Sequence, residues 1–275
     1  MDHKLTKLTT ILGDLGSALV AYSGGVDSAF LAAVAQRVLG HRALCVTAVS
    51  PSYPRWELED AVALAQELGL NHRVVETHEA ENPDYLANTS ARCFFCKVEL
   101  YDTLAPIAQA EGLAHIIDGF NYDDRQDFRP GHKAGSQYGV RSPLFEAELT
   151  KAEIRDLSKA LGLRTWDKPA MACLSSRVPY GTPIDLETLR RIEAAEGFLR
   201  TLGFRQLRVR HHGAMARIEV PPEDMVRFLD AAVREPAVQH LRRLGYAYVS
   251  LDLVGYRTGS LNEVLSGTPR RNSAS

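Results

Sequence analysis

The sequence has few cysteines and no run of apolar residues long enough to cross a bilayer. Four cysteines among 275 residues do not suggest a disulfide-stapled scaffold, so we expect thiols or metal ligands. The first residues also lack the apolar core of a secretory signal peptide. We therefore expect a cytoplasmic protein with no membrane partner.

A strong excess of one charge is also missing. The formal net charge is −2, with 24% charged and 45% hydrophobic residues. A balanced chain has no overall attraction for nucleic acid, although a local basic patch stays possible. At this length and apolar content the chain can bury a substantial core, and we expect two domains.

Two common phosphate-binding patterns, G-x-x-x-x-G-K-[ST] and G-x-G-x-x-G, do not occur in the chain. Residues 23–28 read SGGVDS instead, between an apolar strand and a helical stretch. The backbone N–H groups of such a turn and the positive helix N-terminus converge on one anion, and Ser23 and Ser28 add hydroxyl donors. An ordinary Gly-Gly turn is the alternative interpretation.

Asp27 is the acid in this turn. A carboxylate beside a polyphosphate repels it unless a cation lies between them, so Asp27 indicates Mg²⁺ bridging to pyrophosphate. The full string resembles the PP-loop of ATP pyrophosphatases, which cleave ATP to AMP and pyrophosphate while adenylating a substrate oxygen. The ATP-binding residues expected here are Ala21, Ser23, Gly24, Gly25, Asp27, Ser28, Ser50 and Gly119.

Apolar strands alternate with helical stretches through the first half of the chain. We expect strands at 17–23, 43–50, 72–77 and 114–118, and helices at 26–39, 56–69 and 93–111. This alternation predicts an α/β fold with a doubly wound, Rossmann-like parallel sheet that binds ligands at the carboxyl ends of its strands. The adenine should lie near residues 49–53. The polar stretch 118–139 has the length of a functional or disordered loop.

The pattern changes after residue 181. Helix 185–202, strands 205–211 and 214–220, a helix after Pro221-Pro222 and a strand at 246–253 indicate a smaller α+β domain. We therefore expect an ATP-binding domain over residues 1–181, including a cysteine-bearing connector. Residues 182–275 would form the substrate-binding and oligomerisation domain.

Cys93 and Cys96 form a C-x-x-C pair at the start of a predicted helix. Residues 88–90 can cap this helix, which would put both thiols on one face, where the positive helix end lowers the thiol pKa. Cys173 adds a third thiol in the connector. Cys45 lies inside an apolar strand and is predicted to be a core residue, and two core thiols are also the alternative for the C-x-x-C pair.

Three thiolates are compatible with two kinds of metal site. Zinc would need a fourth ligand, and no histidine is close to these cysteines in the sequence. An iron–sulfur cluster on Cys93, Cys96 and Cys173 would leave one iron open to a substrate or an extra sulfide. Together with an adenylating PP-loop, an open iron suggests that sulfur replaces the activated oxygen and AMP leaves.

Four stretches together resemble the LarE family, the ATP-dependent sulfur transferases of nickel-pincer nucleotide cofactor biosynthesis. They are residues 23–28, 118–119 with 127–131, 175–181, and 208–210 with 216–219. The resemblance covers nearly the whole chain. It implies adenylation of pyridinium-3,5-biscarboxylic acid mononucleotide, conversion of a carboxylate to a thiocarboxylate, and a homo-oligomer such as a trimer or hexamer.

The family has two sources of sulfur. In one, a connector cysteine gives up its own sulfur and becomes dehydroalanine, and that position falls on Ala172 here, beside Cys173. In the other, three cysteines hold a 4Fe–4S cluster that passes on a bound sulfide. Cys93, Cys96 and Cys173 resemble this second type, with sulfide or another sulfur donor supplying the cluster.

Arginines in the second half are the predicted substrate ligands. Strand alternation puts Arg208 and Arg210 on one face, a fork suited to the mononucleotide phosphate. Arg177 would neutralise the substrate carboxylate or phosphate and, with Asp27 and Cys173, completes the expected catalytic set. The alternatives are a solvated strand face for the pair and an ion pair that fixes the connector for Arg177.

Glu196 and Glu219 would bind a cation in the family manner. An aspartate expected later in that pattern falls on Arg227, which departs from the family.

Three other functions stay open. Thiocytidine synthetases also combine a PP-loop with C-x-x-C and a distant cysteine, but we do not expect tRNA as a partner of this near-neutral chain. Amide-forming PP-loop synthetases need an ammonia source and would leave the three cysteines without a role. A nucleotide sensor would leave them unused as well.

Overall fold

The computed structural model describes residues 2–126, 130–170, 172–257 and 259–262. It divides into two compact units. The first unit comprises Met1–Tyr85 and Ser90–Met171, and the second unit comprises Leu86–Thr89 and Ala172–Ser275. By its packing the connector 172–181 thus belongs to the second unit, while the functional division at residue 181 stays a prediction. In the described part of the chain, no helix is long and apolar enough to cross a membrane.

The first unit contains a four-stranded parallel sheet in the order β3-β2-β1-β4. Its strands are β1 (Ala18–Ala21), β2 (Ala43–Val49), β3 (His72–Glu76) and β4 (His115–Ile117). The chain moves outward from β1 to β3 and then returns to the other side of β1, so the order reverses between β1 and β4. This confirms the predicted doubly wound α/β fold and puts its switch point beside the SGGVDS turn.

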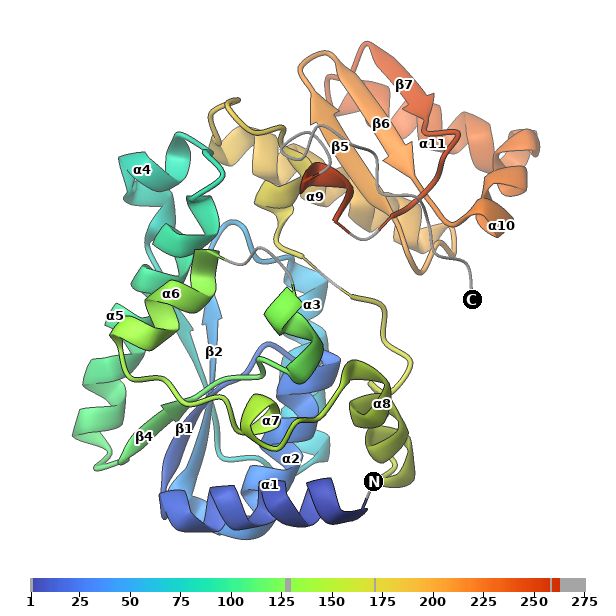
Figure 1. The fold of residues 1–275 in the computed structure, drawn as a ribbon. Coiled ribbons are helices and arrows are strands. Elements are labelled where there is room, and N and C mark those ends of the chain that lie inside the picture. Colours follow the sequence, from blue (N-terminus) through green and yellow to red (C-terminus); the bar gives the residue numbers. More distant parts are fainter. Residues whose placement is uncertain (1, 127–129, 171, 258, 263–275) are drawn as a thin grey trace. The chain divides into compact units, whose positions relative to one another are not determined.

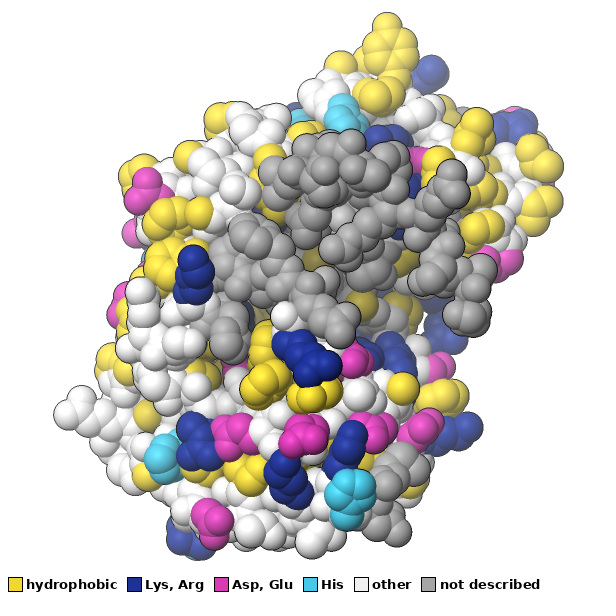
Figure 2. Space-filling view, viewed as in Figure 1, with side chains coloured by type: hydrophobic (Ala, Val, Ile, Leu, Met, Phe, Trp, Pro, Cys, Tyr) yellow, Lys and Arg dark blue, Asp and Glu magenta, His cyan; other side chains and the backbone are white. Residues whose placement is uncertain are grey.

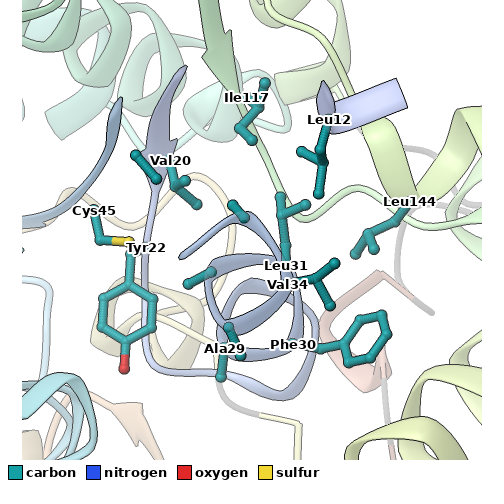
Figure 3. Packing of buried hydrophobic residues seen from close by; sticks show 14 of the residues in the cluster. Leu12, Val20, Tyr22, Ala29, Phe30, Leu31, Val34, Cys45, Ile117 and Leu144 are labelled. Atoms are coloured by element: carbon teal, nitrogen blue, oxygen red, sulfur yellow. The ribbon is translucent and has the colours of Figure 1, made fainter. Parts of the chain in front are cut away.

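Helices cover both faces of this sheet (Figure 1). They are α1 (Asp2–Leu15), α2 (Val26–Leu39), α3 (Arg55–Glu67), α4 (Pro83–Leu86), α5 (Arg92–Ala110), α6 (Pro130–Gln137), α7 (Pro143–Glu146) and α8 (Lys151–Ala160). Alternate strand residues enter two cores: Val20 packs with α2 on one face, and Leu19 packs with α5 on the other. Figure 3 shows Leu31 of α2 near Val20 and Ile117.

Cys45 lies in the first of these cores with none of its surface exposed, as predicted. The predicted helix 26–39 has the bounds of α2, and the other predicted strands and helices of this unit agree within a few residues. Helices α1 and α8 had not been predicted. Of the long polar stretch, the described part includes the 3-10 turn Tyr122–Gln126 and α6, and residues 127–129 lie outside the described residues.

The second unit has a three-stranded sheet in which β5 (Arg208–His212) is antiparallel to β6 (Met215–Glu219), and β6 is parallel to β7 (Tyr248–Leu251). Its helices are α9 (Leu186–Thr201), α10 (Pro222–Met225) and α11 (Ala231–Arg243). Leu199, Val209 and Leu241 belong to one apolar core, which joins α9, β5 and α11. This confirms the smaller α+β unit, although α11 had not been predicted.

The prediction that residues 88–90 cap α5 is wrong. The helix begins after Ala91, which makes no side-chain cap. Asn88 is fully buried in the second unit, where its side-chain amide donates to the carbonyls of Pro179 and Thr182, both at 2.8 Å. These two hydrogen bonds hold the connector.

Candidate functional site

The SGGVDS turn joins β1 directly to α2, as the sequence predicts. Gly25 is the N-cap of α2 and makes no side-chain cap. Gly24 has a φ of +65°, and a Cβ atom there would lie 2.7 Å from the Cβ of Ala61 in α3. Glycine is therefore required at position 24 by both its backbone conformation and its close packing.

The hydroxyl of Ser28 closes the turn. Its Oγ accepts a hydrogen bond from the backbone N–H of Ser23 at 3.2 Å and lies 3.1 Å from the Ser23 Oγ. It also donates to the carbonyl of Gly25 at 3.3 Å. The two predicted hydroxyl donors are thus brought together at the start of α2, at the end of the strand that contains Ala21.

Gly119 reaches the same place from the end of β4. A Cβ atom at this position would lie 3.1 Å from the backbone N of Ser28 and 3.3 Å from the Cβ of Asp27. The preceding Asp118 is fixed by hydrogen bonds from the Ser142 hydroxyl at 2.7 Å and from the Tyr101 hydroxyl at 3.2 Å. The structure therefore joins the two sequence stretches at the switch point of the sheet.

Asp27 has one paired and one unpaired carboxylate oxygen. Its Oδ2 accepts a hydrogen bond from the Nζ of Lys151 at 2.5 Å, while its Oδ1 is buried and has no hydrogen-bond partner among the described residues. An unsatisfied buried acceptor costs about 1–3 kcal/mol. A hard cation satisfies such an oxygen, so the turn is chemically suited to Mg²⁺ that keeps its waters and phosphate ligands.

Lys151 was not among the site residues predicted from the sequence. It is the first residue of α8, whose N-cap Thr150 forms a capping box with Glu153. Its backbone N–H donates to the Oδ2 of Asp123 at 2.8 Å. The string T-K-A-E is a helix-start signal that would have placed this lysine at a helix end, but only the tertiary structure pairs it with Asp27.

Ser50 follows β2 and contacts a buried acid. Its hydroxyl donates to the Oε1 of Glu79 at 2.5 Å, and the Ser52 hydroxyl donates to the same oxygen at 3.1 Å. Glu79 is 3% exposed and was not a sequence candidate. Tyr53 connects this segment to the SGGVDS turn, because its hydroxyl donates to the carbonyl of Ser23 at 2.9 Å. The adenine position near this segment stays a prediction.

The second unit buries the predicted arginines. Arg177 has no exposed surface and donates from Nε and Nη2 to the two carboxylate oxygens of Glu196, both at 2.8 Å. Its Nη1 donates to the carbonyls of Ala172 at 2.5 Å and Cys173 at 2.9 Å. Burial lowers the pKa of Arg177, but the charge of Glu196 more than offsets this effect and raises it. Arg177 therefore forms an ion pair that fixes the connector.

Arg208 and Arg210 are buried as well. Arg210 donates to both carboxylate oxygens of Glu219 at 3.0 Å, and Arg208 lies with its guanidinium 5.0 Å from the ring centre of Tyr256. Burial and the nearby Arg177 lower the pKa of Arg208 to about 10. The alternative of a solvated strand face is wrong, because the two arginines are only 4% and 6% exposed.

The two glutamates predicted as cation ligands accept hydrogen bonds from arginines instead. Glu196 is bound by Arg177, and Glu219 is bound by Arg210 and by Arg217 at 3.0 Å. Arg227 stands at the position where an aspartate was expected from the resemblance. Its guanidinium donates to the carbonyl of Leu202 at 2.6 Å.

The cysteines fall into two environments. Cys93 is exposed and Cys96 half-buried in the first turns of α5, and Cys173 is half-buried just before the 3-10 turn Leu174–Arg177. The exposure of Cys93 contradicts the alternative of a pair of core thiols. Burial raises the pKa of Cys45 to about 12, so that thiol stays protonated.

No group of three or more His, Cys, Asp and Glu side chains in the described residues is gathered as a metal site. Cys93 and Cys96 belong to the first unit and Cys173 to the second. The three cysteines of the predicted cluster therefore come from both units.

The chain is similar to known proteins over part or nearly all of its length. A family model described as NAD synthase matches residues 11–86. The chain is 38% identical to the pyridinium-3,5-bisthiocarboxylic acid mononucleotide synthase of Lactiplantibacillus plantarum, over 96% of this chain and 95% of that protein. It is 50% identical to an uncharacterized protein of Synechocystis sp., over 97% and 99% of the two chains. An NH(3)-dependent NAD(+) synthetase of Finegoldia magna is 29% identical over 54% of this chain and 62% of its own.

Proposed function

The chain belongs to the LarE family of ATP-dependent sulfurtransferases, and from this premise we propose that it acts on pyridinium-3,5-biscarboxylic acid mononucleotide. In the proposed reaction ATP adenylates a carboxylate of this small-molecule substrate and pyrophosphate leaves. A sulfide then displaces AMP, and the carboxylate becomes a thiocarboxylate. The similarity of almost the whole chain to a pyridinium-3,5-bisthiocarboxylic acid mononucleotide synthase supports this assignment.

The observation that carries the adenylation step is the convergence of the SGGVDS turn, Gly119 and the unpaired oxygen of Asp27. The turn offers backbone N–H donors at a helix N-terminus, which is a common way to bind phosphate. Mg²⁺, when bound, would neutralise the charge between Asp27 and the pyrophosphate group. The residues proposed for the ATP site are Ala21, Ser23, Gly24, Gly25, Asp27, Ser28, Ser50 and Gly119.

We propose that the buried arginines of the second unit bind the mononucleotide. Arg177 pairs with Glu196 and Arg210 pairs with Glu219, and the charge of Glu196 also acts on Arg208. The forked donors of these guanidinium groups are suited to a phosphate or carboxylate of the substrate. The bidentate ion pairs with Glu196 and Glu219 hold Arg177 and Arg210 in fixed orientations. Arg177 therefore acts on the substrate through its fixed positive charge rather than as a mobile ligand.

For the sulfur source we propose a 4Fe–4S cluster on Cys93, Cys96 and Cys173. The donor set suits such a group, because these three thiols are at least partly accessible whereas Cys45 is not. The cluster, when bound, would supply a sulfide on its fourth iron. Ala172 stands at the position of the sacrificial cysteine, which supports a cluster over a sacrificed side chain. Sulfide or another sulfur donor would replenish it.

We also propose that the enzyme works as a cytoplasmic homo-oligomer, on the family resemblance alone. A tRNA partner is not supported. Figure 2 shows acidic and basic side chains interspersed on one face of the protein. Ion pairs of the first unit include Lys4–Glu153 and Lys7–Glu148.

The cysteines provide the decisive test of the sulfur source. The protein is purified anaerobically, and iron, acid-labile sulfide and the brown chromophore are measured together with sulfur transfer and ATP-dependent adenylation. Replacing Cys93, Cys96 or Cys173 by alanine should remove the chromophore and sulfur transfer but leave adenylation. Cys45→Ala is the matched control and should keep all three properties.

The opposite outcome is equally clear. If colourless wild-type protein loses the mass of H₂S after one turnover, and Cys93→Ala still completes that turnover, the sulfur comes from a sacrificed side chain. The cluster proposal would then be wrong, while the adenylation proposal would stand.

Amide formation is a second candidate, because the NAD synthase model matches residues 11–86. In that reaction ammonia rather than sulfide would displace AMP from the adenylated carboxylate. Supplying either nucleophile to the adenylated substrate and identifying the product by mass spectrometry separates the two functions.

A further inference from the structure

Two carbonyl oxygens of the SGGVDS turn are held by side chains from other parts of the first unit. The Ser23 carbonyl accepts a hydrogen bond from the Tyr53 hydroxyl at 2.9 Å. The Gly24 carbonyl accepts one from the Nζ of Lys168 at 3.3 Å. Neither donor belongs to the motif. Tyr53 is the last residue of the segment 49–53 that was expected near the adenine, whereas Lys168 was not a sequence candidate.

These two hydrogen bonds fix the direction of the next two N–H groups. The peptide unit is planar and trans, so its C=O and N–H point in opposite directions. The Ser23 carbonyl shares a peptide unit with the N–H of Gly24, and the Gly24 carbonyl shares one with the N–H of Gly25. Both N–H groups are therefore turned away from Tyr53 and Lys168, and neither donates a hydrogen bond to any described residue.

Lys168 is placed to hold the turn rather than to bind phosphate. Its Nζ also pairs with Glu57 at 2.8 Å and Asp60 at 3.0 Å, and its side chain is 13% exposed. Burial raises the pKa of Asp60, but the hydrogen bonds and charges of Lys168 and Arg164 outweigh that and lower it. Two carboxylates of α3 thus neutralise the ammonium, while the carbonyl of Gly24 accepts one of its hydrogen bonds.

The segment that contains Lys168 is itself fixed. Arg155 of α8 donates to the carbonyl of Lys168 at 2.8 Å and to that of Trp166 at 2.6 Å. On the other side of the turn, burial and the neighbouring Glu57 raise the pKa of Tyr53, so its hydroxyl stays a proton donor. The Tyr53 hydroxyl therefore keeps its proton throughout the neutral pH range.

We propose that Tyr53 and Lys168 are positioning residues of the ATP site, which aim the N–H groups of Gly24 and Gly25 at the pyrophosphate moiety of ATP. The inference rests on the proposed adenylation of the substrate. Donors that already point at the ligand need no reorganisation on binding, so the two side chains increase affinity without touching the nucleotide.

The test measures pyrophosphate and adenosine binding separately by calorimetry. Tyr53→Phe removes only the hydroxyl and keeps the aromatic ring in the segment 49–53 that is expected near the adenine. Lys168→Met removes the ammonium from a side chain of similar length. Each variant should weaken pyrophosphate binding about five- to tenfold, which is the usual change in affinity when one hydrogen bond is lost. Adenosine binding should be unchanged. Lys168→Arg keeps a charged donor and should restore most of the pyrophosphate affinity.

Matched controls come from the same unit. Tyr138→Phe removes a hydroxyl that donates to Asp102, and Lys159→Met removes an ammonium that lies over Trp166. Both should bind pyrophosphate like the wild type. If Lys168→Met does not fold because Glu57 is left unpaired, Tyr53→Phe and Lys168→Arg still decide the question.

Two results would overturn the inference. One is unchanged pyrophosphate affinity in Tyr53→Phe, and the other is an equal loss of pyrophosphate and adenosine binding, which would indicate a general structural role. If the wild type binds neither ATP nor pyrophosphate, the proposed function itself is wrong. The two failures are therefore distinguishable in one series of measurements.

Discussion

The two units contain candidate anion sites that are built by opposite means. In the first unit, the SGGVDS turn offers backbone N–H groups and two hydroxyls, and its one acid has one oxygen paired with Lys151 and one without a partner among the described residues. In the second unit, arginines are buried against glutamates, and Arg177 has no exposed surface at all. A turn of this kind binds an anion through backbone N–H groups that point to one place, so it needs only the local course of the backbone. Buried charges need partner side chains from other elements.

The difference has an energetic consequence. Removing a hydroxyl or the carboxylate of the turn should change ligand binding and leave the fold intact, because Asp27 and its partner Lys151 are both partly exposed and water can solvate the remaining charge. Removing one member of a buried ion pair leaves the other member without a partner, which destabilises the fold. The following predictions test this contrast, from the largest expected effect to the smallest.

The first prediction breaks the site in the first unit. Asp27→Asn and Ser28→Ala should each lower AMP and pyrophosphate formation by at least about 10²-fold, because they remove the proposed Mg²⁺ ligand and a hydroxyl of the turn. Circular dichroism and the iron content should be unchanged. Adenylation at the wild-type rate in both variants would contradict the nucleotide assignment.

The second prediction breaks the ion pair in the second unit. Glu196→Ala leaves Arg177 buried without its carboxylate and should reduce the free energy of unfolding by about 3–5 kcal/mol, measured by urea titration. Glu187→Ala on the same helix removes an exposed pair with Arg191 and should cost less than about 1 kcal/mol. Equal losses in the two variants would show that the buried pair has no special structural role.

The third prediction concerns substrate binding. Arg208→Ala and Arg210→Ala should weaken binding of the pyridinium mononucleotide by about 10- to 100-fold and leave ATP binding unchanged, since a charge-assisted hydrogen bond contributes about 1.5–3 kcal/mol. Arg190→Ala, at an exposed position of α9, is the control. Unchanged substrate affinity in Arg208→Ala would leave this arginine a purely structural role.

The fourth prediction is the smallest and concerns pH. A hydrogen bond from Lys4 lowers the pKa of Glu153 to about 2, although partial burial opposes it. A lowered folded-state pKa gives stability that is present above the unfolded value of about 4.3 and is lost as pH falls toward 2.

Because this pair is near the surface, the loss should stay below about 1 kcal/mol. Acid unfolding of wild type and Glu153→Gln measures it. The wild type should lose more stability than the variant between pH 5 and about pH 2. An identical pH dependence of the two proteins would contradict the prediction.

The fold of the first unit was predictable because its signals are local. A buried apolar strand, a glycine turn and an amphipathic stretch gave helix 26–39 with the bounds of α2. The strand alternation also predicted that Arg208 and Arg210 share a face, which the structure places inside the second unit. It did not predict their partners, since Glu219 lies on the neighbouring strand β6, and Glu196, which pairs with Arg177, lies on α9.

The missed residues share one property. Lys151, Lys168, Tyr53 and Glu79 contact the motif or its neighbours only through the tertiary fold. The start signal of α8 and the segment expected near the adenine indicated where Lys151 and Tyr53 lie, but no local pattern indicated which groups these residues contact. Asn88 was assigned to a helix cap for the same reason, because the carbonyls that it binds lie about ninety residues away.

The sequence by itself determined the parallel sheet, the phosphate-binding turn and the buried position of Cys45, because strand periodicity, glycine conformation and apolar burial act over a few neighbouring residues. Only the tertiary structure decided which side chains complete those parts. It paired Lys151 with Asp27, tied Lys168 to the carbonyl of Gly24 and enclosed the arginines with their glutamates. The interaction energy of two charges, or of a hydrogen-bond donor and its acceptor, depends on the distance between them in the folded protein. The order of residues along the chain does not specify that distance.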